Sequence, residues 1–304
     1  MPVGSTKVVE RSLQRPDISV VSNPEFLREG SAVHDFLHPD RVVIGSDDRQ
    51  AALKVASIYD ALSAKIIITD PASAETIKYA ANAFLATKLS FINAIAAICE
   101  GVGADINDVV LGIGSDTRIG ANFLQPGPGW GGSCFPKDSR ALIKIAEDAE
   151  YNFDLLKGVI TVNDQQFDRV TEKIRRAAGG SVSGKVVAVW GLTFKAGTDD
   201  LRDSPSLQII HRLLNLGAII QAFDPTVTAH RSGLSQEIQI TDSALACTRD
   251  AEVLVVLTEW SEFTKIEPSE IRAVMSGRIV VDGRNLLDRS TWQEAGFTHL
   301  GIGR

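Results

Sequence analysis

Short apolar runs alternate with helix-like segments between residues 185 and 283. Four of these runs are typical of buried strands: KVVAVWG (185–191), AIIQAFD (218–224), AEVLVVLT (251–258) and GRIVVDG (277–283). Residues 204–217 have helical periodicity, with Ser204 as the expected N-cap, Pro205 at the first helical position and Gly217 at the end. Because continuous apolar strands separated by helices indicate a parallel sheet covered on both faces, we predict a Rossmann-like, doubly wound domain over residues 181–304.

A single long helical pattern covers about residues 72–101. Asp70 is a plausible N-cap, Pro71 occupies the first helical position, and Gly101 and Gly103 end the pattern. A helix of roughly 30 residues is about 45 Å long, more than one small core can cover. We therefore expect it to link domains or to form a subunit interface. It would belong to a central helical domain, residues 71–180, with further helices at about 105–113, 137–150 and 155–177, before the linker GGSVSG (179–184).

The first 70 residues are predicted to be part of an α/β unit. The runs ISVVS (18–22), RVVIG (41–45) and KIIITD (65–70) are strand-like, and residues 49–63 are helical. Three strands cannot close a doubly wound sheet, and no phosphate-binding glycine loop precedes them. The expected fold class is therefore α/β, with a remnant of an N-terminal α/β unit (1–70), a central long-helix domain and a C-terminal doubly wound sheet.

The charge balance and the cysteines narrow the class of protein. The 304 residues carry a formal net charge of −7, which argues against nucleic acid or an anionic membrane as the main partner. The most apolar segment, 80–99, contains Asn82, Lys88 and Asn93, so it is a poor membrane span. Three widely spaced cysteines predict neither a disulfide framework nor a metal site, and they favour a cytoplasmic setting.

Cys134 lies in GWGGSCFPKD (129–138), between glycines and a predicted helix start at Pro136. The aligned peptide dipoles of a helix N-terminus stabilise a thiolate, and Lys137 adds a positive charge nearby. Gly131 and Gly132 would let the backbone approach a ligand closely. A nucleophilic cysteine is therefore favoured. The alternative is a small buried cysteine beside a tight turn.

Two further pairs of residues have the four-residue spacing of one helix face. Lys78 and Asn82 could stabilise an oxyanion or bind a sugar hydroxyl, although a solvated polar stripe is the simpler interpretation. Glu25 and Glu29 follow Pro24, which is expected to open a short helix, and could act as general bases or only favour a helix N-terminus. His34 and His38 share this spacing too; without a third ligand they are expected to be surface or packing residues.

The segment GLTFKAGTDDLRDSP (191–205) joins a predicted strand to a helix, where a doubly wound fold binds nucleotides. Lys195 and Arg202 could bind phosphates, and Asp224 ends the next strand, where a ribose-binding acid would lie. An ordinary crossover loop is the alternative.

Together these motifs resemble the UDP-glucose/GDP-mannose dehydrogenase family. The resemblance covers essentially the whole chain in order, through NPEFLREG, KYAANAFLATKLSFINAIA, GADINDV, DTRIG, GPGWGGSCFPKD, GLTFKAGTDDLRDSPS and DGRN. Within the family, AANAFLATKLSFIN and DTRIGANFL are more similar to the UDP-glucose 6-dehydrogenase branch than to the GDP-mannose branch.

The resemblance implies a two-step oxidation of the C6 alcohol of UDP-glucose to UDP-glucuronate, with one hydride going to NAD+ each time. Cys134 would attack the intermediate aldehyde, and the thiohemiacetal would be oxidised to a thioester that water hydrolyses. Lys78 and Asn82 would stabilise the C6 oxyanion, Asp138 would order or deprotonate water, and Glu25 would be the base for hydrolysis.

The resemblance also implies binding residues and a partner. The central helix forms the dimer core in this family, so a homodimer through residues 72–101 is expected, and Arg118 could act in the partner subunit's site. The expected contacts to NAD are Glu29, Cys134, Lys137 and Arg202. The expected contacts to the UDP-sugar are Glu25, Phe26, Leu27, Arg28, Glu29, Lys78, Asn82, Arg118, Gln125, Pro126, Gly127, Pro128, Gly129, Trp130, Gly131, Phe194, Lys195 and Arg284.

One departure from the family bears on activity. Family members carry an N-terminal NAD-binding domain with GxGxxG after its first strand and a catalytic threonine, and the 304 residues do not include them. We expect a nearly complete sugar-nucleotide half-site and little or no turnover by this chain alone. Three alternatives stay open: a non-catalytic, dimerising sugar-nucleotide-binding fragment; a dehydrogenase of GDP-mannose or an N-acetylated UDP-sugar; and another cysteine enzyme, such as an acyltransferase, which is disfavoured because no histidine lies in a cysteine-bearing motif.

Overall fold

The computed structural model describes residues 3–228, 231 and 234–304. The chain divides into two compact units: unit 1 comprises Met1–Phe84 and Lys137–Leu156, and unit 2 comprises Leu85–Pro136 and Lys157–Arg304. Helix α4 (Pro71–Val102) contributes to both units, as do α6 (Phe135–Asp148) and α7 (Asp154–Ala177). Each unit is described by itself.

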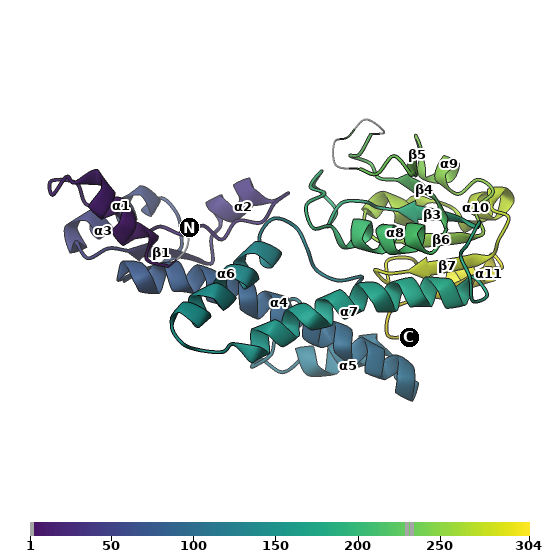
Figure 1. Ribbon diagram of the computed structural model, residues 1–304, viewed down its shortest axis with the longest axis horizontal. Helices are drawn as coiled ribbons and strands as arrows, with labels where there is room; N and C mark the ends of the chain where they lie inside the picture. The colour runs from purple at the N-terminus through teal and green to yellow at the C-terminus, as the bar shows by residue number, and fades with distance from the viewer. Residues whose placement is uncertain (1–2, 229–230, 232–233) are drawn as a thin grey trace. The chain divides into compact units, whose positions relative to one another are not determined.

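Unit 2 contains a six-stranded parallel sheet of order β5-β4-β3-β6-β7-β8 (Figure 1). This order confirms the predicted doubly wound architecture, since the chain starts at β3, builds outward to β5 and then crosses to β6 on the other side. The strands are β3 (Val186–Trp190), β4 (Ile219–Phe223), β5 (Ile238–Ile240), β6 (Val253–Val256), β7 (Ile279–Asp282) and β8 (Thr298–Leu300). The four predicted strands are all present; β5 and β8, at three residues each, were not predicted.

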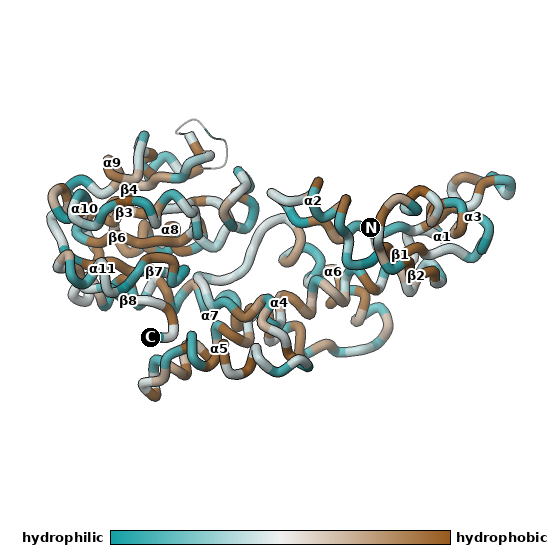
Figure 2. Tube along the Cα trace, turned by 180° about the vertical axis from the view of Figure 1, so that it is seen from behind, coloured by the Kyte–Doolittle hydropathy of each residue, from teal (hydrophilic) through white to brown (hydrophobic). Residues whose placement is uncertain are grey.

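Alternate residues of the unit 2 strands enter two separate hydrophobic cores, as the period of two requires. Val187 and Val189 of β3 point to one face, where they pack with α8, α7, α5 and the second half of α4. Ala188 and Trp190 point to the other face, which α9, α10 and α11 cover. The central strands β3 and β6 are coloured as strongly apolar in Figure 2. The helices are α5 (Ile106–Gly114), α8 (Pro205–Asn215), α9 (Ala244–Cys247), α10 (Pro268–Val274) and α11 (Arg289–Glu294), with the short 3-10 helix η2 (Ser261–Lys265).

Unit 1 contains a parallel pair of strands that run in register from Arg41↔Lys65 to Gly45↔Thr69. Its elements are α1 (Ser5–Leu13), α2 (Ala32–Leu37), β1 (Arg41–Gly45), α3 (Arg49–Ala56), the 3-10 helix η1 (Ser57–Tyr59) and β2 (Lys65–Thr69), followed by the first half of α4 and most of α6. Strand β1 is buried beneath α3, whereas Ile66 and Ile68 of β2 are 36% and 41% exposed.

Two local predictions for these regions were wrong, and a third, the N-cap at Ser204, was confirmed in position. ISVVS (18–22) is not a strand, because only Ser22 forms an isolated antiparallel bridge, to Gly45. Pro24 does not open a helix; α2 begins at Ala32, so Glu25 and Glu29 do not share a helix face. Ser204 is at the N-cap of α8, but its hydroxyl makes no capping bond there and instead donates to the Leu192 carbonyl at 2.6 Å.

Helix α4 matches the predicted long helix and starts as expected. Asp70 accepts a hydrogen bond from the Ser73 amide at 2.9 Å, which satisfies one of the free donors of the first turn. The helix is long and apolar enough to cross a membrane by length and composition alone. Ile92, Ala96 and Cys99 nevertheless pack into the main core of unit 2, so α4 is a core helix.

Candidate active site

Unit 1 joins four of the five predicted catalytic residues into two directly bonded pairs. Lys78 donates to a carboxylate oxygen of Glu25 at 3.0 Å and to the Glu25 carbonyl at 2.6 Å. Asn82, one turn further along α4, donates to Asp138 of α6 at 2.6 Å. Because Lys78 and Asn82 lie on one face of α4, both pairs belong to the same surface of that helix.

The Asn82–Asp138 pair is buried, so the carboxylate of Asp138 needs partners that compensate its charge. Asp138 is 2% exposed and Asn82 is 8% exposed. The second Asp138 oxygen pairs with Lys137 at 2.5 Å, so a partly exposed ammonium balances the buried carboxylate. Tyr79 lies in the same environment: burial raises the pKa of its hydroxyl, and the Asp138 charge raises that pKa further. A buried carboxylate held by an amide and an ammonium can orient water, which is the role that the family resemblance implies for Asp138.

The segment 25–29 lacks regular structure up to a turn at its end. The Leu27 amide donates to Glu25 at 2.7 Å, and the Phe26 ring lies under the Arg41 guanidinium at 3.8 Å. Arg28 forms an ion pair with Asp35 at 2.5 Å, and this pair holds the pKa of Asp35 well below its usual range. These contacts fix the segment against α2 and β1 without helical structure.

Cys134 directly precedes α6, as predicted, and its side chain is only partly buried. Its sulfur lies 3.6 Å from the Ser133 hydroxyl. The other two cysteines are buried, and burial raises the pKa of Cys247 to about 12. Cys134 is therefore the cysteine that a reagent or substrate can reach most readily.

Close packing explains why residues 131 and 132, just before Cys134, are glycines, which the sequence alone did not reveal. A side chain at Gly131 would collide with the Asp203 carbonyl oxygen, and Gly132 adopts φ +80° with the Phe194 ring against it. The Gly132 amide also donates to the Arg202 carbonyl at 3.0 Å. In unit 2, close approach at these glycines joins the cysteine loop to the loop after β3.

Amide side chains hold residues 125–131, and sequence reasoning missed their role. Asn93 of α4 accepts from the Gly127 amide at 2.8 Å, and Gln166 of α7 donates to the Gly127 carbonyl at 2.8 Å. Asn163 pairs with both main-chain groups of Trp130, at 2.8 and 2.9 Å. The available signal was an amide side chain on the apolar face of a helix. Gln125 is exposed, whereas Pro126, Gly127, Pro128 and Trp130 are buried and Gly129 is intermediate.

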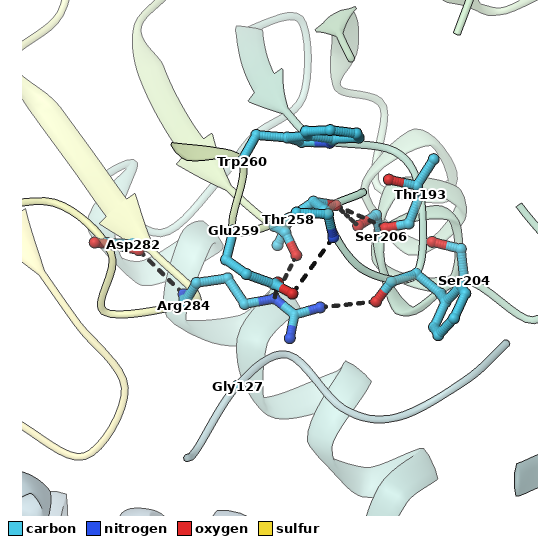
Figure 3. A network of polar contacts seen from close by, with 12 residues as sticks. Gly127, Thr193, Ser204, Ser206, Thr258, Glu259, Trp260, Asp282 and Arg284 are labelled. Atoms are coloured by element: carbon cyan, nitrogen blue, oxygen red, sulfur yellow. Dashed lines mark hydrogen bonds and ion pairs between the residues drawn. The ribbon is translucent and has the colours of Figure 1, made fainter. Parts of the chain in front are cut away.

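The carboxyl ends of β3 and β7 carry three more predicted residues of unit 2, of which Figure 3 labels Arg284. Arg284, after β7, donates to the Leu257 carbonyl at 2.8 Å and to the Phe194 carbonyl at 3.1 Å. The Lys195 ammonium lies 5.5 Å from the centre of the Phe194 ring. This edge is the switch point of the sheet, where doubly wound folds bind ligands.

Asp224 does not have the free carboxylate that ribose binding would need. It is 2% exposed, and one oxygen accepts from the Leu192 amide at 2.8 Å and from the Trp260 indole at 3.1 Å. The other oxygen accepts from the Thr226 amide and hydroxyl. The geometry therefore gives Asp224 the role of fixing the loop after β3.

The other predicted cations are paired at the surface. Arg118 is highly exposed and pairs with Asp116 at 2.5 Å, and Arg202 forms a two-pronged pair with Asp200 at 2.9 Å. His34 and His38 are exposed, with ring centres 4.7 Å apart. In the described part of the chain, no three His, Cys, Asp or Glu side chains form a group able to bind a metal.

Comparison with known proteins decides the family. Residues 72–165 match the central domain of the UDP-glucose/GDP-mannose dehydrogenase family, 188–289 match its UDP binding domain, and 1–63 match its NAD binding domain. The UDP-glucose 6-dehydrogenase TuaD of Bacillus subtilis is 44% identical over all of this chain and 67% of its own length. The chain belongs to the UDP-glucose/GDP-mannose dehydrogenase family.

Other family members agree with this assignment. The UDP-glucose 6-dehydrogenase of Rickettsia conorii is 42% identical over all of this chain and 71% of its own length. A solved UDP-glucose dehydrogenase from Pyrobaculum islandicum superposes with a TM-score of 0.90 at 34% identity, over 100% of this chain and 69% of that one. The chain is thus identified as an NAD-dependent enzyme family member, as the sequence motifs predicted.

The described residues fit only part of an NAD site. Lys137 and Arg202 keep exposed side chains that could bind phosphate, at 65% and 68%. However, the first turn of α1 is already occupied, because the buried Glu75 carboxylate accepts from the Gly4 and Thr6 amides at 2.5 and 2.8 Å. The described sheet of unit 1 has two strands, with no glycine loop before them. These residues therefore do not form a dinucleotide site by themselves.

Proposed function

We propose that this chain performs the sugar-binding and thiol chemistry of UDP-glucose 6-dehydrogenase, in the oxidation of UDP-glucose to UDP-glucuronate. The observation that carries the proposal is the double pairing of Lys78 with Glu25 and of Asn82 with Asp138 in unit 1. The match of residues 188–289 to a UDP binding domain supports a UDP-sugar as the ligand. In this proposal residues 1–70 belong to the NAD-binding domain, 71–180 to the dimerisation domain and 181–304 to the UDP-sugar domain.

The proposed chemistry at C6 uses the residues of this chain in sequence. The Cys134 thiolate adds to the C6 aldehyde, forming a carbon–sulfur bond and placing negative charge on the former carbonyl oxygen. Lys78 and Asn82 donate hydrogen bonds to that oxygen, which lowers the barrier to addition. The first oxidation, which gives the aldehyde, also releases the hydroxyl proton, and the second converts the thiohemiacetal oxyanion to the thioester. In each, the hydride would go to NAD+, the cofactor of the family.

Hydrolysis of the thioester completes the proposed reaction. Water adds to the acyl carbon and the carbon–sulfur bond breaks, which gives a carboxylic acid and the regenerated thiolate; the acid then loses its proton to solvent. Asp138 orients that water and Glu25 accepts its proton. Glu25 would then leave Lys78, which releases the ammonium for the oxyanion.

We also propose the binding roles that the resemblance implied. Segment 25–29, loop 125–131, Phe194, Lys195 and Arg284 contact the UDP-sugar, and Glu29, Lys137 and Arg202 contact NAD. In this proposal the chain is cytoplasmic. A homodimer through α4 is supported by an exposed apolar stripe at seven-residue intervals, made by Phe84, Phe91 and Ile98. Arg118 would then act in the partner's site. Light scattering should give a dimer for the wild type and a monomer for Phe91→Asp.

Calorimetry on the purified 304-residue chain tests the function. UDP-glucose should bind without NAD+, more tightly than GDP-mannose, and little NADH should form because the NAD contacts are incomplete. The partial contacts at Lys137 and Arg202 should still give weak NAD+ binding. Binding of UDP-glucose without any NAD+ binding would favour the alternative of a non-catalytic sugar-nucleotide-binding fragment. Steady NADH production by the chain alone would refute the expected low turnover, and an equal rate in Cys134→Ser would then show that the thiol mechanism is wrong.

A further inference from the structure

One carboxylate in unit 2 contacts two groups of the proposed sugar-nucleotide site. Glu259 follows β6, and its Oε2 lies 3.1 Å from Nε of Arg284 (Figure 3). Its Oε1 accepts a hydrogen bond from the Ala196 amide at 3.4 Å. Glu259 therefore connects Arg284 with the loop that carries Phe194 and Lys195.

Hydrogen bonds to described residues hold every nitrogen of Arg284 except Nη1. Its amide donates to Asp282 at 3.0 Å, its Nε–H donates to the Leu257 carbonyl, and Nη2 donates to the Phe194 carbonyl. Nη1 makes no hydrogen bond with the described residues and faces Gly127, where an added Cβ would lie 3.3 Å from it (Figure 3). The one open edge of the guanidinium thus points to the loop 125–131.

The carboxylate of Glu259 is an unexpected group in a site for an anion. Its negative charge repels a diphosphate, which by Coulomb's law weakens binding. Oε2 is also buried and accepts no hydrogen bond from any described residue, because the Nε–H of Arg284 is directed to Leu257. A buried carboxylate oxygen without a hydrogen bond is unfavourable. The ion pair with Arg284 at 3.1 Å offsets part of this cost, which points to a role for Glu259 in holding the guanidinium.

We propose that Glu259 is a positioning residue that holds Arg284 and the 194–196 loop in the arrangement that binds the sugar nucleotide. The ion pair restricts the guanidinium to the orientation in which Nη1 faces the ligand, so less side-chain entropy is lost on binding. This inference rests on the proposed function, in which Arg284, Phe194 and Lys195 contact the UDP-sugar.

Glu259→Gln separates positioning from simple electrostatics, because it removes the charge while keeping the size of the side chain. By calorimetry with UDP-glucose on the 304-residue chain, we expect about tenfold weaker binding, although the loss of a negative charge should favour an anion. The matched control is Glu262→Gln, which removes the same charge from an exposed position on η2. It should change the affinity by no more than about twofold. Tighter binding in Glu259→Gln would overturn the proposal.

The same substitution in an Arg284→Ala background gives a test that a merely structural role would fail. A glutamine oxygen can still accept the hydrogen bond from the Ala196 amide. Without Arg284 the substitution therefore removes only the repulsion, and adding Glu259→Gln should strengthen binding by about twofold relative to Arg284→Ala alone. Equal weakening in both backgrounds would mean a general structural defect and would overturn the positioning role. If Arg284→Ala binds like the wild type, or the wild type does not bind UDP-glucose, the proposed function fails and this inference fails with it. Weakening by Arg284→Ala without weakening by Glu259→Gln overturns the inference alone.

Discussion

The two sheets of this molecule differ in how completely they are covered. In unit 2 the central strands β3, β6 and β7 have hydrophobic cores on both faces, and every residue of β6 is buried. In unit 1 the sheet has two strands, and Ile66 and Ile68 of β2 remain exposed. Parallel sheets are usually covered on both faces, so the stability of unit 2 comes from its own core, whereas unit 1 depends on few buried apolar contacts.

The largest expected difference between the units comes from removing an isoleucine side chain. Ile210→Ala, in the fully buried face of α8, should lower the stability of unit 2 by about 2–5 kcal/mol, because it leaves a cavity. Ile68→Ala in β2 should cost no more than about 1 kcal/mol. Hydrogen exchange under increasing urea, read from β6 and β1 peptides, measures both effects. Equal losses would contradict the comparison.

A smaller contrast is expected for amides that bind main-chain groups. Asn163→Ala leaves the buried amide and carbonyl of Trp130 without partners and should cost about 1–3 kcal/mol. Asn23→Ala removes a part-buried donor to the Val43 carbonyl and an exposed acceptor of the Tyr59 hydroxyl. Because Asn23 itself is exposed, water can replace its groups, and the cost should be about 1 kcal/mol or less. Urea unfolding followed separately in each unit would check the order, and a larger loss for Asn23→Ala would reverse it.

The smallest effect concerns two exposed aspartates that cap helices, Asp288 before α11 and Asp48 before α3. Hydrogen bonds from the Thr291 hydroxyl and then its amide lower the pKa of Asp288 to about 2, and a hydrogen bond from Ser19 lowers the pKa of Asp48. A lowered pKa means that the ionised form stabilises the fold above the unfolded value of about 3.9, and that this is lost as pH falls towards the folded pKa.

We therefore expect Asp288→Asn and Asp48→Asn to lower the melting temperature slightly at pH 7. The deficit of Asp288→Asn should disappear between about pH 4 and pH 2. Thermal melts across this range provide the measurement. A deficit that stays constant with pH would show that the charge is not responsible.

The same comparison explains what the sequence could predict. The strands at 185–191 and 251–258 were predictable because each is a continuous apolar run between helices. Strands β5 and β8 were missed because a strand of three residues is too short to show a periodic pattern of apolar side chains. The strand prediction for ISVVS was wrong because only Ser22 of this segment pairs with β1, through an isolated bridge to Gly45. The pairing of Lys78 and Asn82 on one face followed from helical spacing. Their partners Glu25 and Asp138 lie 53 and 56 positions away, which periodicity cannot reveal. Glu259 and Asn163 were missed for the same reason.

The most direct test of the account is the alkylation rate of Cys134. Iodoacetamide should modify Cys134 in the folded chain well before the buried Cys99 and Cys247, as peptide mapping by mass spectrometry would show. Saturating UDP-glucose should slow the modification of Cys134 by at least about tenfold, because the sugar would cover the thiol that attacks it. An unchanged rate, at a UDP-glucose concentration where calorimetry shows full binding, would contradict the proposed role of Cys134.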